Sequence, residues 1–258
     1  MEKVIFFGNG MLADAALEVL SRECEVVFHA RTKEDLEEVK RLKREVPEAH
    51  GVLASFGVMI REDVLDLFEP EGILNIHPSL LPLYRGASPI ESAILAGDSD
   101  FSVSVMKLVK AMDAGPIYYQ TTLSQLPLDK AEIYKVLATT GAEWIVENLS
   151  KLPTPTAQDD TKATFTAKLT KDMGVLTPET DSAEVLLRKI VAFQGFPKPK
   201  FTFYGHSCII LEAHILEEGG TAGLMVPCAD GRAVAIDRLQ PEGRKPMDAK
   251  SFLNGYAK

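Results

Sequence analysis

Short apolar runs alternate with helix-like segments along the first 80 residues of the chain. The runs predict strands over residues 3–7, 25–29, 51–56 and 73–77. Between them, apolar positions that recur every three or four residues predict helices over residues 11–20, about 35–46 and 61–68. Strands that alternate with amphipathic helices are typical of βαβ units around a parallel sheet, so the sequence predicts an α/β domain of Rossmann-like topology.

The pattern changes after residue 100. Residues 102–108 alternate strictly between polar and apolar side chains, which predicts an antiparallel or edge strand, and residues 116–123 predict another strand. A long helix is expected over residues 130–150. The segment 151–161 is rich in proline, threonine and acidic residues, so we interpret it as a linker that ends a first domain over residues 1–150.

Residues 162–258 predict a different kind of domain. A helix is expected over residues 182–193, and short apolar strands separated by glycines are expected near residues 200–203, 208–212, 223–226 and 233–236. Several short strands of this kind predict a small β-barrel. Neither half shows an internal repeat or a low-complexity tract.

Composition excludes several classes of protein. The 258 residues are 46% hydrophobic and 25% charged, which is typical of globular chains and excludes disordered and fibrous ones. The net charge of −9 argues against a general polyanion binder, but it is uneven. Residues 1–160 carry 15 Lys and Arg against 26 Asp and Glu, whereas residues 161–258 carry 13 against 11. The second half is therefore the part better suited to an anionic partner.

The chain shows neither a signal-peptide pattern nor an apolar run long enough for a membrane span. Its three cysteines, Cys24, Cys208 and Cys228, are widely spaced and form no paired motif, so neither a disulfide framework nor a zinc site is indicated. These features favour a cytoplasmic protein that has no metal.

A glycine pattern follows the first predicted strand. Gly8-Asn9-Gly10-Met11-Leu12-Ala13 matches the G-x-G-x-x-A turn of dinucleotide-binding domains. The second predicted strand ends at His29-Ala30-Arg31, however, without the acidic residue that would hold a ribose. A tight turn between strand and helix explains the glycines better, although a nicotinamide-dependent reductase stays open.

The stretch Asn75-Ile76-His77-Pro78 places an amide and an imidazole at the end of a buried strand. Asn75 and His77 are two residues apart, so they project from the same face at the carboxyl end of the strand, where open α/β sheets bind ligands. Both can donate hydrogen bonds to the oxygen that becomes negative in acyl transfer. Taken alone, such a pair is more often structural.

A carboxylate strengthens the catalytic interpretation. Asp113 lies in the turn Met112-Asp113-Ala114-Gly115-Pro116, between the two later strands. A carboxylate beside a histidine favours the imidazolium and can accept or relay a proton through water. We expect the three side chains to meet at loops along one edge of the predicted sheet.

The segments NIHPSLLPLYRGASPI and MDAGPI resemble the folate-dependent formyltransferases. The resemblance implies a parallel-sheet formyltransferase domain and a catalytic trio at Asn75, His77 and Asp113. It also implies transfer of the formyl group of the cosubstrate 10-formyltetrahydrofolate to a primary amine through a tetrahedral intermediate, without a metal. The expected folate-site residues are Ser79, Leu80, Leu81, Pro82, Phe56 and Gly57.

The C-terminal part resembles the OB-like, RNA-contacting domain of those family members that formylate methionyl initiator tRNA. The resemblance thus implies an enzyme of translation initiation with initiator methionyl-tRNA as its partner, and we expect a monomer. Such members usually carry a basic insertion after the second strand, whereas here Arg31-Thr32-Lys33 leads directly into a helix. The residues that we assign to RNA contact are Arg31, Lys33 and Arg85.

Other functions remain open from the sequence. Formyl transfer to an amino sugar of a nucleotide sugar uses the same motif, and a non-catalytic RNA-binding protein could share the scaffold. The C-terminal barrel could also serve dimerisation or packing rather than RNA contact.

Overall fold

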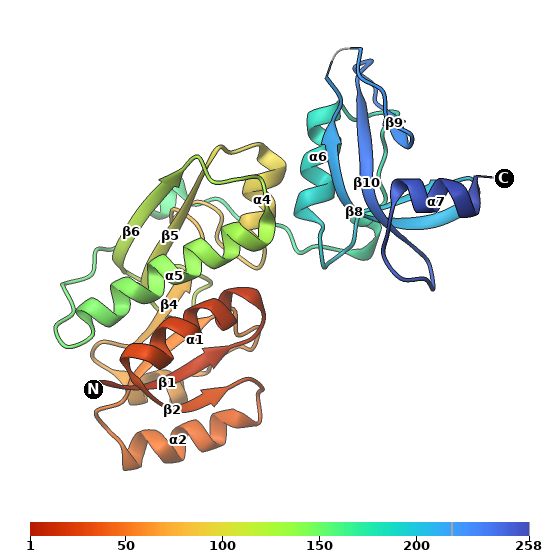
Figure 1. The fold of residues 1–258 in the computed structure, drawn as a ribbon. Coiled ribbons are helices and arrows are strands. Elements are labelled where there is room, and N and C mark those ends of the chain that lie inside the picture. The colour runs from red at the N-terminus through yellow and green to blue at the C-terminus, as the bar shows by residue number, and fades with distance from the viewer. Residues whose placement is uncertain (218, 258) are drawn as a thin grey trace. The chain divides into compact units, whose positions relative to one another are not determined.

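The computed structural model describes residues 1–217 and 219–257, and its contacts divide the chain into two compact units (Figure 1). The first unit comprises Met1–Ile90 and Ser99–Ala167, and the second comprises Glu91–Asp98 and Lys168–Lys258. Residues 151–167, which include the segment expected to be a linker, belong to the first unit by their contacts. There Thr156 pairs with Ile117, and Phe165 pairs with Arg85.

A six-stranded sheet forms the centre of the first unit, in the order β2-β1-β3-β4-β5-β6 (Figure 1). Strands β1 to β4 run parallel, and β5 and β6 are added antiparallel. The expected Rossmann-like α/β domain with a late antiparallel strand is therefore confirmed. The strands are β1 (Lys3–Gly8), β2 (Glu25–Ala30), β3 (His50–Ala54), β4 (Ile73–His77), β5 (Asp100–Lys107) and β6 (Ile117–Ser124).

Helices contact both faces of this sheet. Helices α1 and α5 pack against each other, α1 on β1, β2 and β3 and α5 on β4 and β5, whereas α2 contacts β2, α3 and η1. The apolar stripe of α2 packs on the core: Leu36 and Val39 join Phe7 and Phe68 in it, and Leu42 and Val46 pack against it half-buried. The helices are α1 (Met11–Glu23), α2 (Asp35–Glu45), α3 (Glu62–Leu65), η1 (Asp66–Phe68), α4 (Pro89–Ala96), α5 (Lys130–Asn148) and η2 (Asp160–Lys162).

Close packing accounts for the first glycine of the turn after β1. A Cβ atom at Gly8 would overlap the backbone oxygen of Ala54 and lie 2.8 Å from the Cβ atom of Ala13. Gly10 has a φ of +82°, a conformation that glycine adopts without strain. The packing between strand and helix therefore requires these glycines without any bound nucleotide.

The second unit contains a curled antiparallel sheet, in the order β11-β10-β8-β7, with β9 paired to β10. Helix α6 packs on β8 and β10, and α7 packs on β10 and β11. The small OB-like β-domain is confirmed, while α7 was not expected from the sequence. The elements are η3 (Lys171–Gly174), α6 (Ala183–Ala192), β7 (Lys200–Phe203), β8 (His206–Ile215), β9 (Met225–Pro227), β10 (Ala233–Pro241), β11 (Met247–Asp248) and α7 (Ala249–Tyr256).

Helices α6 and α7 each begin at a capping residue. The Ser182 side chain accepts a hydrogen bond from the backbone nitrogen of Val185 at the start of α6, and Asp248 accepts one from Ser251 at the start of α7. Phe252 of α7 is fully buried in the core beneath the sheet. Over the described residues, every helix is too short or too polar to cross a bilayer.

Candidate active site

Strand β4 carries two of the three expected catalytic residues. Its residues Ile73–His77 are all buried, with Asn75 and His77 each only 5% exposed. Asn75 is paired with Leu53 of β3 on one side and Met106 of β5 on the other, and His77 is paired with Ser104 of β5. Strands on both sides therefore hold Asn75, whereas His77 is held by β5 alone, and both side chains line one cavity.

Asp113 reaches the same cavity by a route that differs from the expected one. Because β5 is antiparallel to β4, it ends with Lys107 beside Leu74, at the opposite end of β4 from His77. The loop after β5 then carries Asp113 back, so that its Oδ1 atom lies 3.7 Å from Nδ1 of His77. Its Oδ2 atom accepts a hydrogen bond of 2.8 Å from the backbone nitrogen of Gly86. The structure thus brings the three residues together through a loop rather than through a shared sheet edge.

A hydrogen bond fixes the tautomer of His77. Its Nε2 atom lies 3.1 Å from the carbonyl oxygen of Tyr84. A carbonyl can only accept, so Nε2 carries the proton, and Nδ1 is the nitrogen left to exchange a proton on the Asp113 side. Burial lowers the pKa of His77, while the Asp113 carboxylate and the Tyr84 carbonyl act in the opposite direction. With its pKa below the ordinary value, the imidazole is neutral at pH 7.

Three residues beside the cavity have backbone conformations that side chains disfavour. Ser55, Tyr84 and Asp113 have φ angles of +54°, +57° and +47°, and none of them is glycine. Ser55 and Asp113 line the cavity, and Tyr84 supplies the carbonyl that binds His77. Such conformations gather where the surrounding structure holds residues in place for function.

The cavity has a volume of about 490 Å³ and a largely apolar lining. Besides Asn75, His77 and Asp113, residues of segment 53–60 and loop 108–113 contribute most of the cavity wall. Met59 and Met112 line it although they are 82% and 65% exposed, so apolar side chains stand open at its mouth. The sequence analysis missed them, because a single methionine in a loop belongs to no periodic pattern.

The residues expected to bind folate fall into two groups. Phe56 and Gly57 line the cavity. Residues 79–82, in contrast, lie outside the cavity lining and hold their own loop in shape, which differs from the expectation. Ser79 donates from Oγ to the carbonyl oxygen of Leu83, and Ser104 binds both the carbonyl of Ser79 and the backbone nitrogen of Leu81. Leu80 is exposed, and Pro82 binds Thr164 through its carbonyl oxygen.

Two of the three residues expected to bind RNA are exposed. Arg31 and Lys33 lie on the surface between β2 and α2. Arg85, however, is only 4% exposed, and its guanidinium binds the side chains of Gln158 and Asp160. A guanidinium that is buried against Gln158 and Asp160 is not available to a nucleic-acid phosphate, so Arg85 has structural partners instead of the expected one.

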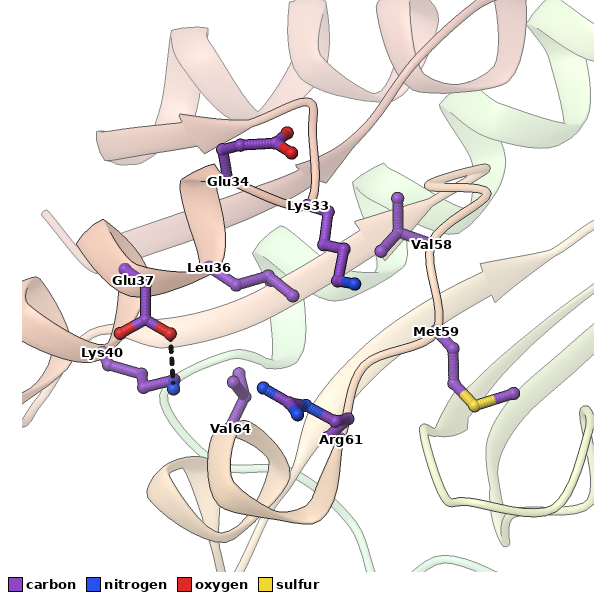
Figure 2. Close-up of a pocket in the computed structure, with 9 residues that line it drawn as sticks. All are labelled: Lys33, Glu34, Leu36, Glu37, Lys40, Val58, Met59, Arg61 and Val64. Carbon is purple, nitrogen blue, oxygen red and sulfur yellow. Dashed lines mark hydrogen bonds and ion pairs between the residues drawn. The ribbon is translucent and has the colours of Figure 1, made fainter.

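A second cavity of about 550 Å³ lies between the start of α2 and the segment from Val58 to Val64 (Figure 2). Figure 2 shows Lys33 extending into this cavity over an apolar floor. Lys40 lies 2.7 Å from both Glu37 and Asp63, so its charge is balanced. The residues that line this second cavity are Lys33, Glu34, Leu36, Glu37, Lys40, Val58, Met59, Arg61 and Val64. Val58 and Met59 also line the first cavity, so the two cavities share a wall.

Within the described part of the chain, no cluster of three or more His, Cys, Asp or Glu side chains could hold a metal ion. Cys24, Cys208 and Cys228 are buried free thiols, and burial raises the pKa of each.

Comparison with known families defines the class of protein. Residues 10–149 match the family model described as formyl transferase, and residues 168–257 match that of the formyl transferase C-terminal domain. The chain therefore belongs to the formyl transferase family.

Within that family, the chain is similar to methionyl-tRNA formyltransferases. The methionyl-tRNA formyltransferase of Granulibacter bethesdensis is 36% identical over 220 residues, which cover 80% of this chain and 68% of the relative. The structure of methionyl-tRNA formyltransferase from Clostridium thermocellum has the same fold, with a TM-score of 0.68 at 18% identity over 93% of this chain and 98% of that one.

A longer protein also contains this fold. HypX from Aquifex aeolicus, solved in complex with tetrahydrofolic acid, matches with a TM-score of 0.77 at 19% identity. The match covers 100% of this chain but only 48% of HypX.

Proposed function

We propose that this enzyme transfers the formyl group of 10-formyltetrahydrofolate to the amino group of methionyl initiator tRNA. The observation that carries the proposal is the grouping of Asn75, His77 and Asp113 around one cavity, in a chain whose relatives at 34–39% identity are methionyl-tRNA formyltransferases. Amide, imidazole and carboxylate are the groups that acyl transfer to an amine requires.

The geometry supports separate roles for the three residues. Asn75 donates from its amide to the formyl oxygen as negative charge develops there. His77 exchanges a proton at Nδ1, because its Nε2–H is held by the carbonyl of Tyr84. Asp113, 3.7 Å from Nδ1, stabilises the imidazolium when it forms and removes the amine proton through water. The neutral imidazole accepts this same proton from Asp113 at Nδ1 and returns it to the departing nitrogen, so one proton passes from the amine to the leaving group.

We propose that the pterin end of the folate occupies the 490 Å³ cavity. The volume suits a ligand of this size, and an apolar wall with a few convergent polar groups is the usual form of a small-molecule site. Phe56 and Gly57 contribute to that wall, together with Ile60 and Val109. The bound folate supplies the formyl group, and the side chains of β4 and of loop 108–113 face it.

Contacts to the tRNA are proposed at two places. Arg31 and Lys33 are exposed at the start of α2, where Lys33 enters a cavity that shares the wall formed by Val58 and Met59. Phosphate contacts there would position the aminoacyl end without reading sequence. Residues 161–258, which carry a slight excess of basic residues, provide further phosphate contacts. We propose that the boundary between the domains lies near residue 167, where the contacts divide.

We further propose a monomeric enzyme of the cytoplasm. Three free, buried thiols suit a reducing compartment. Sedimentation at several concentrations tests the monomer, since a mass that rises with concentration would contradict it.

One experiment tests substrate and reaction together. The protein is incubated with formyl-labelled 10-formyltetrahydrofolate and either charged methionyl initiator tRNA or an amino-sugar nucleotide. We expect label on the tRNA only. Label on the sugar and none on the tRNA would replace the proposed substrate, and no consumption of formylfolate with either amine would favour a non-catalytic RNA-binding protein.

A further inference from the structure

We propose that Gln158 and Arg85 form a positioning clamp that holds Asp113 beside His77 during formyl transfer. The inference rests on the proposed function and deepens it, because it assigns a role to residues outside the catalytic trio. Neither residue faces the reacting atoms, so both act through Asp113.

Gln158 binds the backbone of the catalytic loop at two points. Its Nε2 atom donates to the carbonyl oxygen of Asp113 at 2.8 Å and to that of Gly115 at 2.7 Å. Both hydrogens of the amide are thus donated, one to each of the two residues that flank Ala114. The backbone of the loop is therefore held on both sides of Ala114.

Arg85 fixes the orientation of this amide. Its Nε and Nη2 atoms donate to Oε1 of Gln158 at 3.1 and 2.6 Å, and Nη2 also donates to Asp160 at 2.6 Å. An arginine can only donate, so the oxygen of Gln158 must face Arg85 and its nitrogen must face the loop. The guanidinium is almost wholly buried, and it would lose its partners if the amide turned over.

The segment that contains Arg85 also touches both catalytic groups directly. The carbonyl of Tyr84 binds the ring of His77, and the backbone nitrogen of Gly86 binds the carboxylate of Asp113. A closed circuit therefore runs from His77 through Tyr84 and Arg85 to Gln158, and from there through Asp113 back to His77. Each residue of this circuit therefore helps to hold the two residues that it contacts in place.

The site needs such a clamp for two reasons. Asp113 has a φ of +47°, a strained conformation for a residue with a side chain, and this conformation persists only where contacts enforce it. Its carboxylate lies 3.7 Å from the imidazole, too far for a direct hydrogen bond to hold the pair together. The separation is therefore set by the bond from Gly86 to the carboxylate and by the backbone of the loop, which Gln158 binds.

Two substitutions distinguish positioning from general packing. Gln158→Leu removes every hydrogen bond of the amide. Gln158→Glu keeps an acceptor for Arg85 but has no hydrogens for the carbonyls of Asp113 and Gly115. If positioning depends on these two donors, both variants should lower kcat by about 10- to 100-fold with little change in KM, because small displacements of a catalytic group have effects of this size. Gln158→Glu with the kcat of the wild type would overturn the clamp.

A double-mutant cycle tests whether Gln158 acts through Asp113. In an Asp113→Asn background the carboxylate is already lost, so Gln158→Leu should lower kcat by less than about threefold more. Equal losses in both backgrounds would show that Gln158 acts independently of Asp113, and they would overturn the proposal.

Asn148→Ala is the matched control. It also removes a side-chain amide that donates to a backbone carbonyl, that of Trp144 in α5, but at a place away from the cavity. Its kcat should equal that of the wild type. If the wild type transfers no formyl group at all, the proposed function fails. The contribution of Gln158 to the structure of the loop is then tested by the free energy of unfolding. Gln158→Leu should lower the free energy of unfolding more than Asn148→Ala does, and an equal or smaller effect would overturn the clamp.

Discussion

The Nδ1 atom of His77 lies 3.7 Å from the Oδ1 atom of Asp113, although the strand before Asp113 ends at the far end of β4. This pair sets the electrostatics of the site. Burial favours the neutral imidazole, and the carboxylate favours the charged one. A histidine balanced between the two states is suited to accept a proton and release it within one turnover.

Removal of the imidazole should abolish most of the activity. We expect His77→Ala to lower kcat for formylation of methionyl-tRNA by about 10²- to 10⁴-fold, because general acid–base groups contribute that much. The fold should persist, since two strands flank β4. Steady-state kinetics and circular dichroism check both parts, and a folded variant with normal turnover would exclude His77 from the mechanism.

The buried imidazole also predicts how stability depends on pH. The pKa of His77 in the folded protein lies below the value of about 6.5 for an unfolded chain, so the unfolded state binds a proton more readily. The stabilising effect of the neutral ring is therefore present above about pH 6.5 and is lost as the pH falls toward the folded pKa. Urea unfolding at about pH 7.5 and 5.5 should show a larger loss for the wild type than for His77→Gln. Equal losses would mean that His77 titrates alike in both states.

A glycine in the catalytic loop gives a third prediction. A Cβ atom at Gly115 would overlap the backbone oxygen of Lys107, so Gly115→Ala must displace the loop that carries Asp113. We expect a loss of about 1–3 kcal/mol of stability together with a fall in kcat of at least about tenfold.

Gly255 provides the control for this substitution. It lies in α7, and a Cβ atom there would meet nothing within 4 Å. Gly255→Ala should be neutral or slightly stabilising in thermal unfolding. If Gly115→Ala behaved in the same way, the loop would tolerate more movement than the site requires.

The fourth prediction concerns RNA contact. Lys33→Ala should weaken binding of initiator tRNA and reduce the slope of log affinity against log salt by about 1, because one phosphate contact is lost. Lys135→Ala removes an equally exposed cation from α5 and serves as the comparison. Filter binding at several salt concentrations measures both slopes. If the slope of log affinity against log salt were unchanged in Lys33→Ala, Lys33 would not contact a phosphate of the acceptor stem.

The sequence predicted those features whose causes are local. Buried strands such as β4 and amphipathic helices such as α2 carry their own periodic signal, so their order and the parallel sheet could be read directly. Asn75 and His77 share a strand face for the same reason. Their assignment as catalytic residues, together with Asp113, stays a prediction that the experiments above address.

Other features depend on partners distant in the chain. Arg85 was expected to contact RNA, but it is buried against Gln158 and Asp160, which no sequence pattern connects to it. Residues 79–82 follow the catalytic strand, yet Ser104 of β5 binds their backbone and holds them outside the cavity. Met59 and Met112 were missed because only the folded chain brings their loops together.

Gln158 lies between the two regions that match the family models, which end at residue 149 and resume at residue 168. A catalytic fragment designed on the first match alone would lack Gln158 and also the pairing of Thr156 with Ile117. Where this enzyme is dissected, exchanged between species or fused to another protein, the cut therefore belongs after Ala167.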